Sequence, residues 1–462
     1  MQSTYHEILK ETLEENNSEF EVIDNELHFH KIPLMDIIKQ YGTPLRITYL
    51  PNISKQIQRA KTFFKVAIAR QNYTGNYTYC YCTKSSHFSF VMEEALKNDI
   101  HIETSSAFDL HIIKNLYQRK KLTKETFIIS NGFKRPAYTQ GIVKLINEGF
   151  NIIPVLDNMN EFKAYEKIKK DFNIGIRIAT EEQPNFDFYT SRLGINPNKI
   201  VDFYKEKIKS NRYASLKMLH FFINTGVQDN DYYWNELSKC LQIYIELKKI
   251  CPELDSLNIG GGFPIKSSLQ FEWDYDYIAE KIVETIKNAC DDEDIKHPNL
   301  FTEFGTFTVG ESGLMLYTVL NQKQQNDREM WYMINNSFMT TLPDVWAIDQ
   351  RYPMLAINNW DKESQRVFLG GLTCDSEDFY NAEKHNNKIF LPKLQGKEPL
   401  HLAFFYTGAY QESLSGVGGL KHCLIPSPKH IIISKEDDDE DYTTKLFSKE
   451  QSPKSMMKIL GY

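Results

Sequence analysis

Residues 78–105 read TYCYCTKSSHFSFVMEEALKNDIHIETS, and the fold is decided by the pattern in this stretch. A β-rich run, Thr78–Lys84, is followed by an amphipathic segment, His87–Lys97, and then by a second β-rich run, Asp99–Ser105. Two strands separated by a segment of helical length and periodicity are typical of a parallel β-α-β unit. The stretch therefore predicts an α/β protein.

The same alternation continues along the chain. Further β-rich runs occur at Thr126–Asn131, Asn151–Asp157, Asn173–Ala179, Leu216–Phe222, Ser256–Gly260 and Asn299–Glu303. Amphipathic segments of helical periodicity between them include Phe162–Asp171, Asn235–Ile250 and Tyr277–Cys290. Eight strands that alternate with helices predict a (β/α)8 barrel.

The pattern changes after Gly305, where strands follow one another without long helices between them. The expected strands are Leu314–Val319, Glu329–Ile334, Arg366–Leu369 and His401–Tyr406. Near the other end of the chain, Glu21–Phe29 alternates like an antiparallel strand and is expected to join the same β domain. We therefore predict an N-terminal segment of the β domain at 1–40, a barrel at 41–305 and a mainly β C-terminal domain at 306–462.

Composition limits the kinds of function that this protein can have. A chain of 462 residues is too long for one ordinary core, in agreement with two domains. A net charge of −7 argues against nucleic-acid binding. Because the sequence contains no run of 18 apolar residues, no membrane span is expected. The acidic run Glu436–Asp441 is expected to be a solvated turn or tail.

The cysteines predict a reducing environment. Seven cysteines at irregular spacing indicate free thiols and a cytoplasmic protein. Cys80 and Cys82 form a C-x-C pair, which can bind a metal ion. Because no second Cys or His pair follows at ligand spacing, two small core residues are the preferred interpretation, and no metal is expected.

Polar or glycine-rich positions follow almost every predicted barrel strand, where barrel enzymes place their chemistry. These positions are Lys84, Glu103, Asn131, Asp157, Arg177, Phe222, Gly260–Gly262 and Glu303. The three glycines would let backbone N–H groups approach a phosphate closely. A glycine run alone is equally compatible with a simple tight turn.

Four motifs carry a resemblance to a known family. They are Tyr41–Leu45 (YGTPL), Asn131–Lys134 (NGFK), Leu342–Gln350 (LPDVWAIDQ) and Gly408–Glu412 (GAYQE). On these motifs the chain resembles the fold type III (alanine racemase fold) pyridoxal-phosphate decarboxylases, most of all the biosynthetic arginine decarboxylases. The resemblance covers most of the chain and implies pyridoxal 5'-phosphate as cofactor.

The resemblance implies three catalytic residues. Lys84 would form the Schiff base with the cofactor, and Glu303 would pair with the pyridine nitrogen and keep it protonated. Cys374 would donate a proton to Cα after CO2 has left. In the family this cysteine comes from the neighbouring subunit, so the resemblance also implies a homodimer whose active sites are shared across the interface.

Binding residues follow in the same way. The resemblance assigns the cofactor phosphate to Thr225, Gly261, Gly262 and Tyr410. Arg177 faces the cofactor in relatives, and a structural salt bridge is the alternative for it. Asp375 and Asp349 are candidates to bind the cationic end of the substrate, because a carboxylate meets a guanidinium group through two hydrogen bonds.

The sequence departs from the family pattern at three places. Phe222 stands where relatives have a histidine that stacks on the pyridine ring, and a phenyl ring can also stack there. Thr306 replaces an arginine near the phosphate. His87 follows Lys84 where relatives show Lys-x-Asn, and it is either a new site residue or a histidine at a helix start. His220 is expected in the core, away from the cofactor.

The implied function is decarboxylation of arginine to agmatine in polyamine synthesis. The same architecture also supports decarboxylases of ornithine, lysine, diaminopimelate or carboxynorspermidine. A racemase of this fold would need a second base opposite Lys84 and would not need Cys374. A non-catalytic relative that regulates polyamine enzymes is a further alternative, although such proteins typically lose Lys84 or Cys374, and both are present here.

Overall fold

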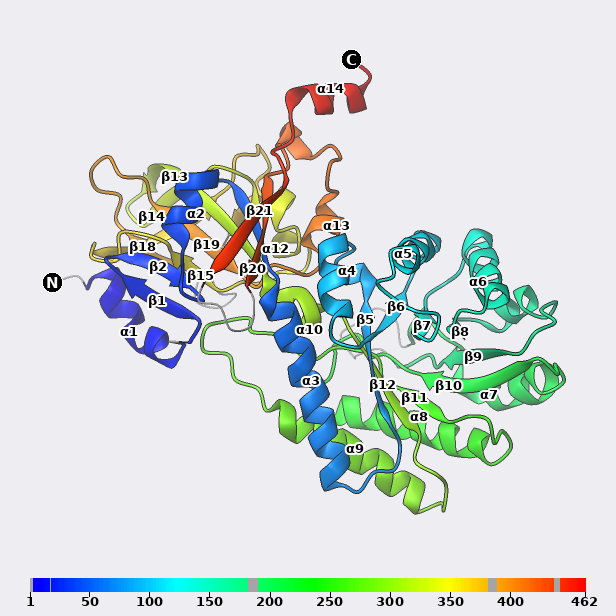
Figure 1. The fold of residues 1–462 in the computed structure, drawn as a ribbon. Coiled ribbons are helices and arrows are strands. Elements are labelled where there is room, and N and C mark those ends of the chain that lie inside the picture. Colours follow the sequence, from blue (N-terminus) through cyan, green and yellow to red (C-terminus); the bar gives the residue numbers. More distant parts are fainter. Residues whose placement is uncertain (1–2, 17, 182–189, 381–388, 436–440) are drawn as a thin grey trace. The chain divides into compact units, whose positions relative to one another are not determined.

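The computed structural model describes residues 3–16, 18–181, 190–380, 389–435 and 441–462 (Figure 1). The chain forms two compact units. The barrel unit comprises Ile53–Pro264 and Trp273–Thr308, and the β unit comprises Met1–Asn52, Ile265–Glu272 and Val309–Tyr462. The predicted acidic run at 436–441 lies outside the described residues except for its last position.

The barrel unit is a closed barrel of eight parallel strands in the order β10-β11-β12-β5-β6-β7-β8-β9. The strands are β5 (Tyr77–Cys82), β6 (His101–Thr104), β7 (Ile128–Ser130), β8 (Ile152–Leu156), β9 (Phe172–Arg177), β10 (Ala214–His220), β11 (Ser256–Asn258) and β12 (Asn299–Phe304). Each strand overlaps one of the eight predicted runs, so the predicted barrel is confirmed.

The barrel strands form because their side chains are buried on both faces, as expected for parallel strands covered by helices. One cluster of buried side chains contains Cys80, Ile129, Ile153, Val155, Met218 and Phe301. Cys82 is buried as well. The two cysteines of the C-x-C pair are therefore packed core residues, as the sequence predicted.

Helices connect most of the barrel strands (Figure 1). They are α3 (Pro51–Arg70), α4 (Ser89–Leu96), α5 (Ala107–Gln118), α6 (Pro136–Glu148), α7 (Pro197–Phe203) with a π turn (Tyr204–Ile208), α8 (Asp231–Lys248), α9 (Tyr275–Asp291) and α10 (Thr306–Val309). Among the described residues, none of the helices is long and apolar enough to cross a membrane.

The predicted helix at Phe162–Asp171 is wrong. The connection between β8 and β9 is a 3-10 helix, η2 (Met159–Ala164), and its winding continues through a bond from the Ile168 N–H to the Tyr165 carbonyl. The apolar residues Phe162, Tyr165 and Ile168 are spaced by three. This spacing fits one face of an α-helix but fits the three-residue repeat of a 3-10 helix equally well.

The β unit contains a three-stranded and a ten-stranded sheet. The first comprises β1 (Phe20–Ile23), β2 (Glu26–Phe29) and β3 (Ile32–Pro33). The second comprises β4 (Leu45–Tyr49), β13 (Gly313–Asn326), β14 (Glu329–Ile334), β15 (Met354–Ala356), β16 (Ser364–Gly370), β17 (Phe379–Tyr380), β18 (Ile389–Pro392), β19 (His401–Phe405), β20 (Lys429–Lys435) and β21 (Tyr442–Ser448). The four strands predicted after Gly305 correspond to β13, β14, β16 and β19 and are confirmed.

The region 21–29 is a hairpin rather than the single strand that its alternation predicted. Strands β1 and β2 pair antiparallel across Asp24 and Asn25, which have φ values of 50° and 65°. Aspartate and asparagine tolerate positive φ better than most residues, so this pair can form a two-residue turn inside an alternating run.

The division between the units also differs from the predicted one. Residues 41–52, expected in the barrel, belong to the β unit because β4 pairs with β13 on one side and with β20 on the other. All five residues of β4 are buried. The N-terminal helix α1 (Tyr5–Glu15) joins this unit too, with the Tyr5 ring 4.7 Å from that of Trp360.

The remaining helices of the β unit are short. They are α2 (Leu34–Tyr41), η4 (Gly310–Ser312), α11 (Phe338–Thr341), α12 (Asp344–Ala347), α13 (Gln411–Ser415), η5 (His422–Leu424) and α14 (Pro453–Leu460).

A buried ion pair links two connections of the barrel. Lys134, in the segment after β7, donates to Glu161 Oε1 at 2.9 Å and to the Val155 carbonyl at 2.7 Å. The exposed fractions of the Lys134 and Glu161 side chains are 0% and 3%. The Lys134 side chain therefore fixes the Asn131–Lys134 segment against the end of β8.

We expect Lys134→Met to lower the free energy of unfolding by about 3–5 kcal/mol, because the change leaves Glu161 buried without its cation. Urea unfolding followed by circular dichroism measures the loss. Adding Glu161→Gln should recover part of it. The matched control is Lys39→Met, whose pair with Asp36 is exposed on both sides and should contribute little to stability. An unchanged unfolding midpoint for Lys134→Met would contradict this account.

Candidate active site

Lys84 lies at the C-terminal end of the barrel strands, in the 3-10 turn Thr83–Ser85 that follows β5. Its Nζ donates to Glu103 Oε2 on β6 at 3.2 Å. The Lys84 side chain is 44% exposed, whereas the Glu103 side chain is fully buried. The amine is therefore held beside a fixed carboxylate while it remains accessible to a ligand.

Glu303, on β12, is a buried carboxylate that accepts hydrogen bonds at both oxygens. Asn131 Nδ2 donates to both of its oxygens at 3.0 and 2.9 Å, and Asn258 Nδ2 donates to Oε1 at 2.6 Å. Burial raises the pKa of Glu303, while Lys84 and the two amides favour its charged form. The arrangement holds a buried carboxylate in one orientation, in which it can accept a hydrogen bond from an N–H group of a ligand.

Asn258 is a site residue that the sequence analysis missed. It is the last residue of β11 and is fully buried. Its Oδ1 also accepts the Gly260 N–H at 2.9 Å, so one side chain connects the Glu303 carboxylate to the glycine run. The sequence did contain a signal for Asn258, because a polar residue at the end of a buried strand requires buried hydrogen-bond partners.

His220 is a core residue, as expected, but it borders the site instead of lying away from it. It ends β10, and its Nε2 is 3.8 Å from Glu303 Oε2. Burial lowers the pKa of His220 to about 3, so the ring is neutral at physiological pH. Its Nδ1 lies 3.2 Å from the Asn258 carbonyl. Because a carbonyl can only accept, the proton of this neutral ring is on Nδ1.

Arg177 ends β9 and lies over the ring of Phe222, with its guanidinium carbon 5.8 Å from the ring centre. Burial lowers the pKa of Arg177, while Asp157, Glu303 and Glu103 oppose this shift. Phe222 follows β10 and is 36% exposed, unusually open for a large apolar side chain beside a barrel. Its ring is available to stack on a flat ligand.

The glycine run is required by close backbone packing. A Cβ on Gly261 would lie 2.0 Å from the Glu303 carbonyl, and one on Gly262 would lie 2.4 Å from the Gly226 Cα. Gly262 also has a φ of +110°, which other residues rarely adopt. These contacts bring the backbone after β11 close to that after β10, where Thr225 lies.

The barrel residues fit pyridoxal phosphate. Within the described part of the chain, the buried polar atoms of this region that have no hydrogen-bond partner include Glu103 Oε1, Asn131 Oδ1, Arg177 Nε and Thr225 Oγ1. Unsatisfied buried polar groups are costly and indicate a missing partner. An anionic ligand can accept hydrogen bonds from the arginine and the threonine, and Glu303 offers an acceptor to a protonated ring nitrogen.

His87 pairs with Asp109 of α5, its Nε2 lying 2.9 Å from Asp109 Oδ1. Burial acts to raise the pKa of Asp109, but hydrogen bonds from His87 and from the Ser105 and Ser106 backbone outweigh it and lower the pKa. Helix α4 begins two residues later, at Ser89. The histidine therefore precedes a helix start and fixes the beginning of α5.

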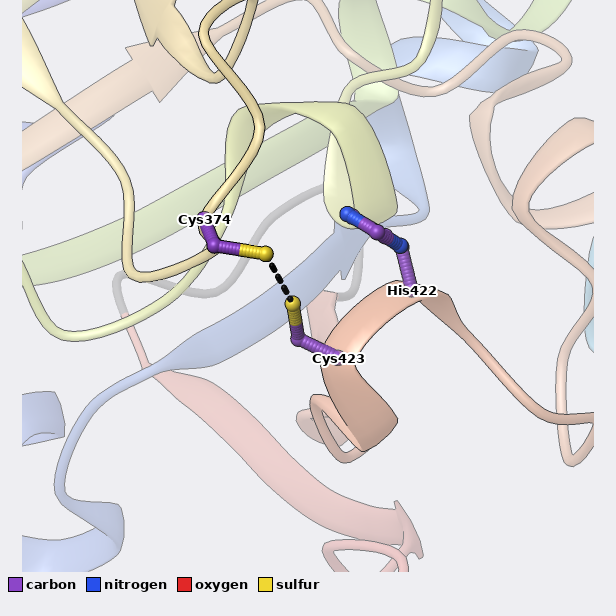
Figure 2. Close-up of side chains that lie close together, drawn as sticks. All are labelled: Cys374, His422 and Cys423. Atoms are coloured by element: carbon purple, nitrogen blue, oxygen red, sulfur yellow. Dashed lines mark hydrogen bonds between the residues drawn. The ribbon is translucent and has the colours of Figure 1, made fainter.

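Cys374 and Asp375 belong to the β unit, in the loop between β16 and β17. Cys374 is exposed, and its Sγ is 3.5 Å from the Sγ of Cys423 (Figure 2). The neighbouring Cys423 raises the pKa of the Cys374 thiol. His422 Nε2 lies 3.9 Å from Asp375 Oδ2. The sequence analysis missed Cys423 and His422, which are far from Cys374 along the chain.

Asp349 and Tyr410 also belong to the β unit. The Asp349 carboxylate pairs with Arg351, so a substrate cation would have to displace that arginine. Tyr410 precedes α13 and has a φ of 66°, which turns the chain sharply into the helix.

Comparisons with known proteins agree with this geometry. Residues 52–310 match the family described as "Pyridoxal-dependent decarboxylase, pyridoxal binding domain". The chain is 20% identical to arginine decarboxylase 2 of Arabidopsis thaliana, over 91% of this chain and 73% of that protein. It is 22% identical to biosynthetic arginine decarboxylase 2 of Synechocystis, over 84% and 78% of the two chains.

Solved structures share the fold. The biosynthetic arginine decarboxylase of Campylobacter jejuni superposes with a TM-score of 0.82 at 20% identity, covering 98% of this chain and 90% of that one. Diaminopimelate decarboxylase of M. jannaschii superposes with a TM-score of 0.77 at 18% identity, covering 94% and 96%. The family match spans more than half of the chain and contains Lys84, Glu303 and the glycine run. The chain therefore belongs to the pyridoxal-dependent decarboxylases.

Proposed function

We propose that this enzyme decarboxylates a basic L-amino acid, with arginine as substrate and agmatine as product, as a step of polyamine biosynthesis. The observation that carries the choice of arginine is a contact between two motifs. Gln411 Nε2 donates to Asp344 Oδ2 at 2.7 Å, and the Asp344 N–H donates to Gln411 Oε1 at 3.3 Å. The two motifs that most resemble the arginine branch, 342–350 and 408–412, are thus built as one substructure.

Lys84 would attach the cofactor. Pyridoxal phosphate, when bound, supplies the electron sink that accepts the electron pair left at Cα as CO2 departs. The half-exposed Lys84 amine beside the buried Glu103 carboxylate supports this role, because it is both accessible and held in place.

Glu303 would hold the pyridine nitrogen in its protonated form. Support comes from the donors around it: Asn131 and Asn258 occupy lone pairs of both oxygens and fix the carboxylate plane. A carboxylate stabilised in its charged form is a strong acceptor for a protonated ring nitrogen.

Thr225, Gly261, Gly262 and Tyr410 would bind the phosphate. The Arg177 guanidinium adds a positive charge to the same barrel mouth and compensates in part for Thr306, which stands where relatives have an arginine. Phe222 would stack on the ring and contribute about 0.5–1.5 kcal/mol beyond its burial. Unlike the histidine of relatives, it cannot share a proton.

Cys374 would deliver the proton to Cα. The thiol is exposed, and a cysteine thiol with an ordinary pKa of about 8.5 already carries its proton at neutral pH, as a proton donor must. Asp375 next to it, with Asp349, would bind the guanidinium group through paired hydrogen bonds. In this proposal Cys374 and Asp375 serve the barrel of the partner subunit, so the enzyme is a homodimer with shared active sites.

We further propose that the enzyme works in the cytoplasm. The support is that all seven cysteines are free thiols, as is usual in a reducing compartment.

Lys84→Ala should abolish the near-ultraviolet to violet absorption band of the lysine-bound cofactor, because that band arises from the bond between the lysine amine and the cofactor. Absorbance of the purified variant after addition of pyridoxal phosphate measures the effect. Lys144→Ala, which removes an exposed lysine of α6, should keep the band. Retention of the band in Lys84→Ala would show that another lysine attaches the cofactor.

The substrate assignment is tested by CO2 release from arginine, ornithine, lysine and diaminopimelate. We expect kcat/KM for arginine to exceed that for the other three by at least about 100-fold, because a site built for paired hydrogen bonds rejects analogues that cannot form them. Asp375→Asn should lower kcat/KM for arginine about 10- to 100-fold, the effect of losing a charge-assisted bond. Faster release from another amino acid would overturn arginine. No release from any of them would favour the non-catalytic alternative.

Cys374→Ala should keep the cofactor band but lose clean amine formation, measured by chromatography of the product. Mixing it with Lys84→Ala should restore about a quarter of the wild-type activity, because half of the randomly exchanged dimers then carry one intact site of two. Exchange itself is checked by tagging the two variants differently and recovering the mixed dimer from the mixture. If mixing restores nothing although subunits exchange, Cys374 does not serve the partner.

A further inference from the structure

Two pairs of adjacent residues lie close together in the β unit, Cys374 with Asp375 and His422 with Cys423. Figure 2 shows three of these side chains, Cys374, His422 and Cys423. The two sulfurs are 3.5 Å apart, and one ring nitrogen of His422 lies within 4.8 Å of both. Asp375 Oδ2 lies 3.9 Å from His422 Nε2. Two thiols and an imidazole thus converge on one exposed spot, and a carboxylate lies next to the imidazole.

The spacing of these side chains suits a tetrahedral zinc ion. Zinc binds thiolate sulfur at about 2.3 Å and imidazole nitrogen at about 2.0–2.1 Å, which places two sulfurs of one tetrahedral site about 3.8 Å apart. The observed 3.5 Å is within a few tenths of an ångström of this spacing. Sulfur and imidazole ligands select zinc and similar soft ions over magnesium or calcium.

The backbone on both sides holds the ligands in position. In the first loop, Asp378 Oδ2 accepts hydrogen bonds from the Thr373 N–H at 3.0 Å and the Thr373 hydroxyl at 2.8 Å, next to Cys374. In η5, Cys423 has a φ of 53°, uncommon for a residue other than glycine. This conformation turns the Cys423 side chain toward Cys374, as Figure 2 shows.

We propose that Cys374, His422 and Cys423 form an inhibitory binding site for Zn²⁺ or a similarly soft divalent ion, with Asp375 or a water molecule as fourth ligand. Binding one ion releases two protons to solvent, one from each thiol, and forms two metal–sulfur bonds. The inhibitory effect rests on the proposed role of Cys374: a thiolate bound to the metal no longer carries the proton that Cα must receive. The cofactor residues of the barrel are not ligands and remain unchanged.

The test uses the reduced, cofactor-loaded enzyme after removal of metal with a chelator. Titration with Co²⁺ should produce the red-region absorption of a tetrahedral sulfur site, clear of the pyridoxal band, with one ion bound per chain. Zn²⁺ should displace Co²⁺ and inhibit decarboxylation, and chelator should reverse the inhibition. Cys423→Ser and His422→Ala should each weaken binding by at least about 100-fold, keep basal activity and lose the inhibition by Zn²⁺. His111→Ala, an exposed histidine of α5, is the matched control and should bind like the wild type.

The proposal is overturned if the reduced enzyme binds neither ion, or if Cys423→Ser and His422→Ala bind as tightly as the wild type. Formation of a Cys374–Cys423 disulfide under mild peroxide, without any ion binding by the reduced form, would also overturn it and assign a redox role to the thiol pair. Ion binding at these residues without inhibition would support the site but contradict its inhibitory effect. The Co²⁺ spectrum reports ion binding and does not depend on turnover. A wrong metal site, seen as no binding, can therefore be distinguished from a wrong catalytic role of Cys374, seen as binding without inhibition.

Discussion

The burial of the Glu303 carboxylate is the constraint on which the site depends. A buried charge is stable only when hydrogen bonds or opposite charges replace the water it has lost. Here the ends of β7 and β11 supply Asn131 and Asn258, and Lys84 and Arg177 supply positive charge. These groups meet only because the eight strands close into a barrel. The fold therefore creates the polar cluster, and the cluster fixes the carboxylate that is proposed to pair with the pyridine nitrogen of the cofactor.

In the proposed mechanism, a phenylalanine stands where the family has a stacking histidine. Phe222 keeps a flat, accessible ring but removes one group able to share a proton. His220 does not replace it, because burial keeps the ring neutral and its one proton faces the Asn258 carbonyl. In the proposed reaction, proton chemistry is thus left to Lys84 of the barrel unit and to the thiol of Cys374, which belongs to the β unit.

Much of the fold could be predicted because the barrel strands are short β-rich runs separated by segments of helical periodicity. The errors arose where local pattern is ambiguous. An apolar spacing of three at Phe162, Tyr165 and Ile168 fits two kinds of helix, and Asp24–Asn25 can be part of a strand or a turn. Strand β4 was placed in the wrong domain because its partners β13 and β20 are hundreds of positions away in the chain, and pairing over such a distance leaves no local signal.

The sequence by itself determined the family and the residues that its motifs mark, Lys84, Glu303 and Cys374 among them, because each is embedded in a recognisable local pattern. The tertiary structure alone decided what surrounds them. Asn131 lies 172 positions from Glu303, and Cys423 lies 49 positions from Cys374. Hydrogen bonds and metal sites depend on distances of a few ångströms between side chains, and only the folded chain brings such distant positions together.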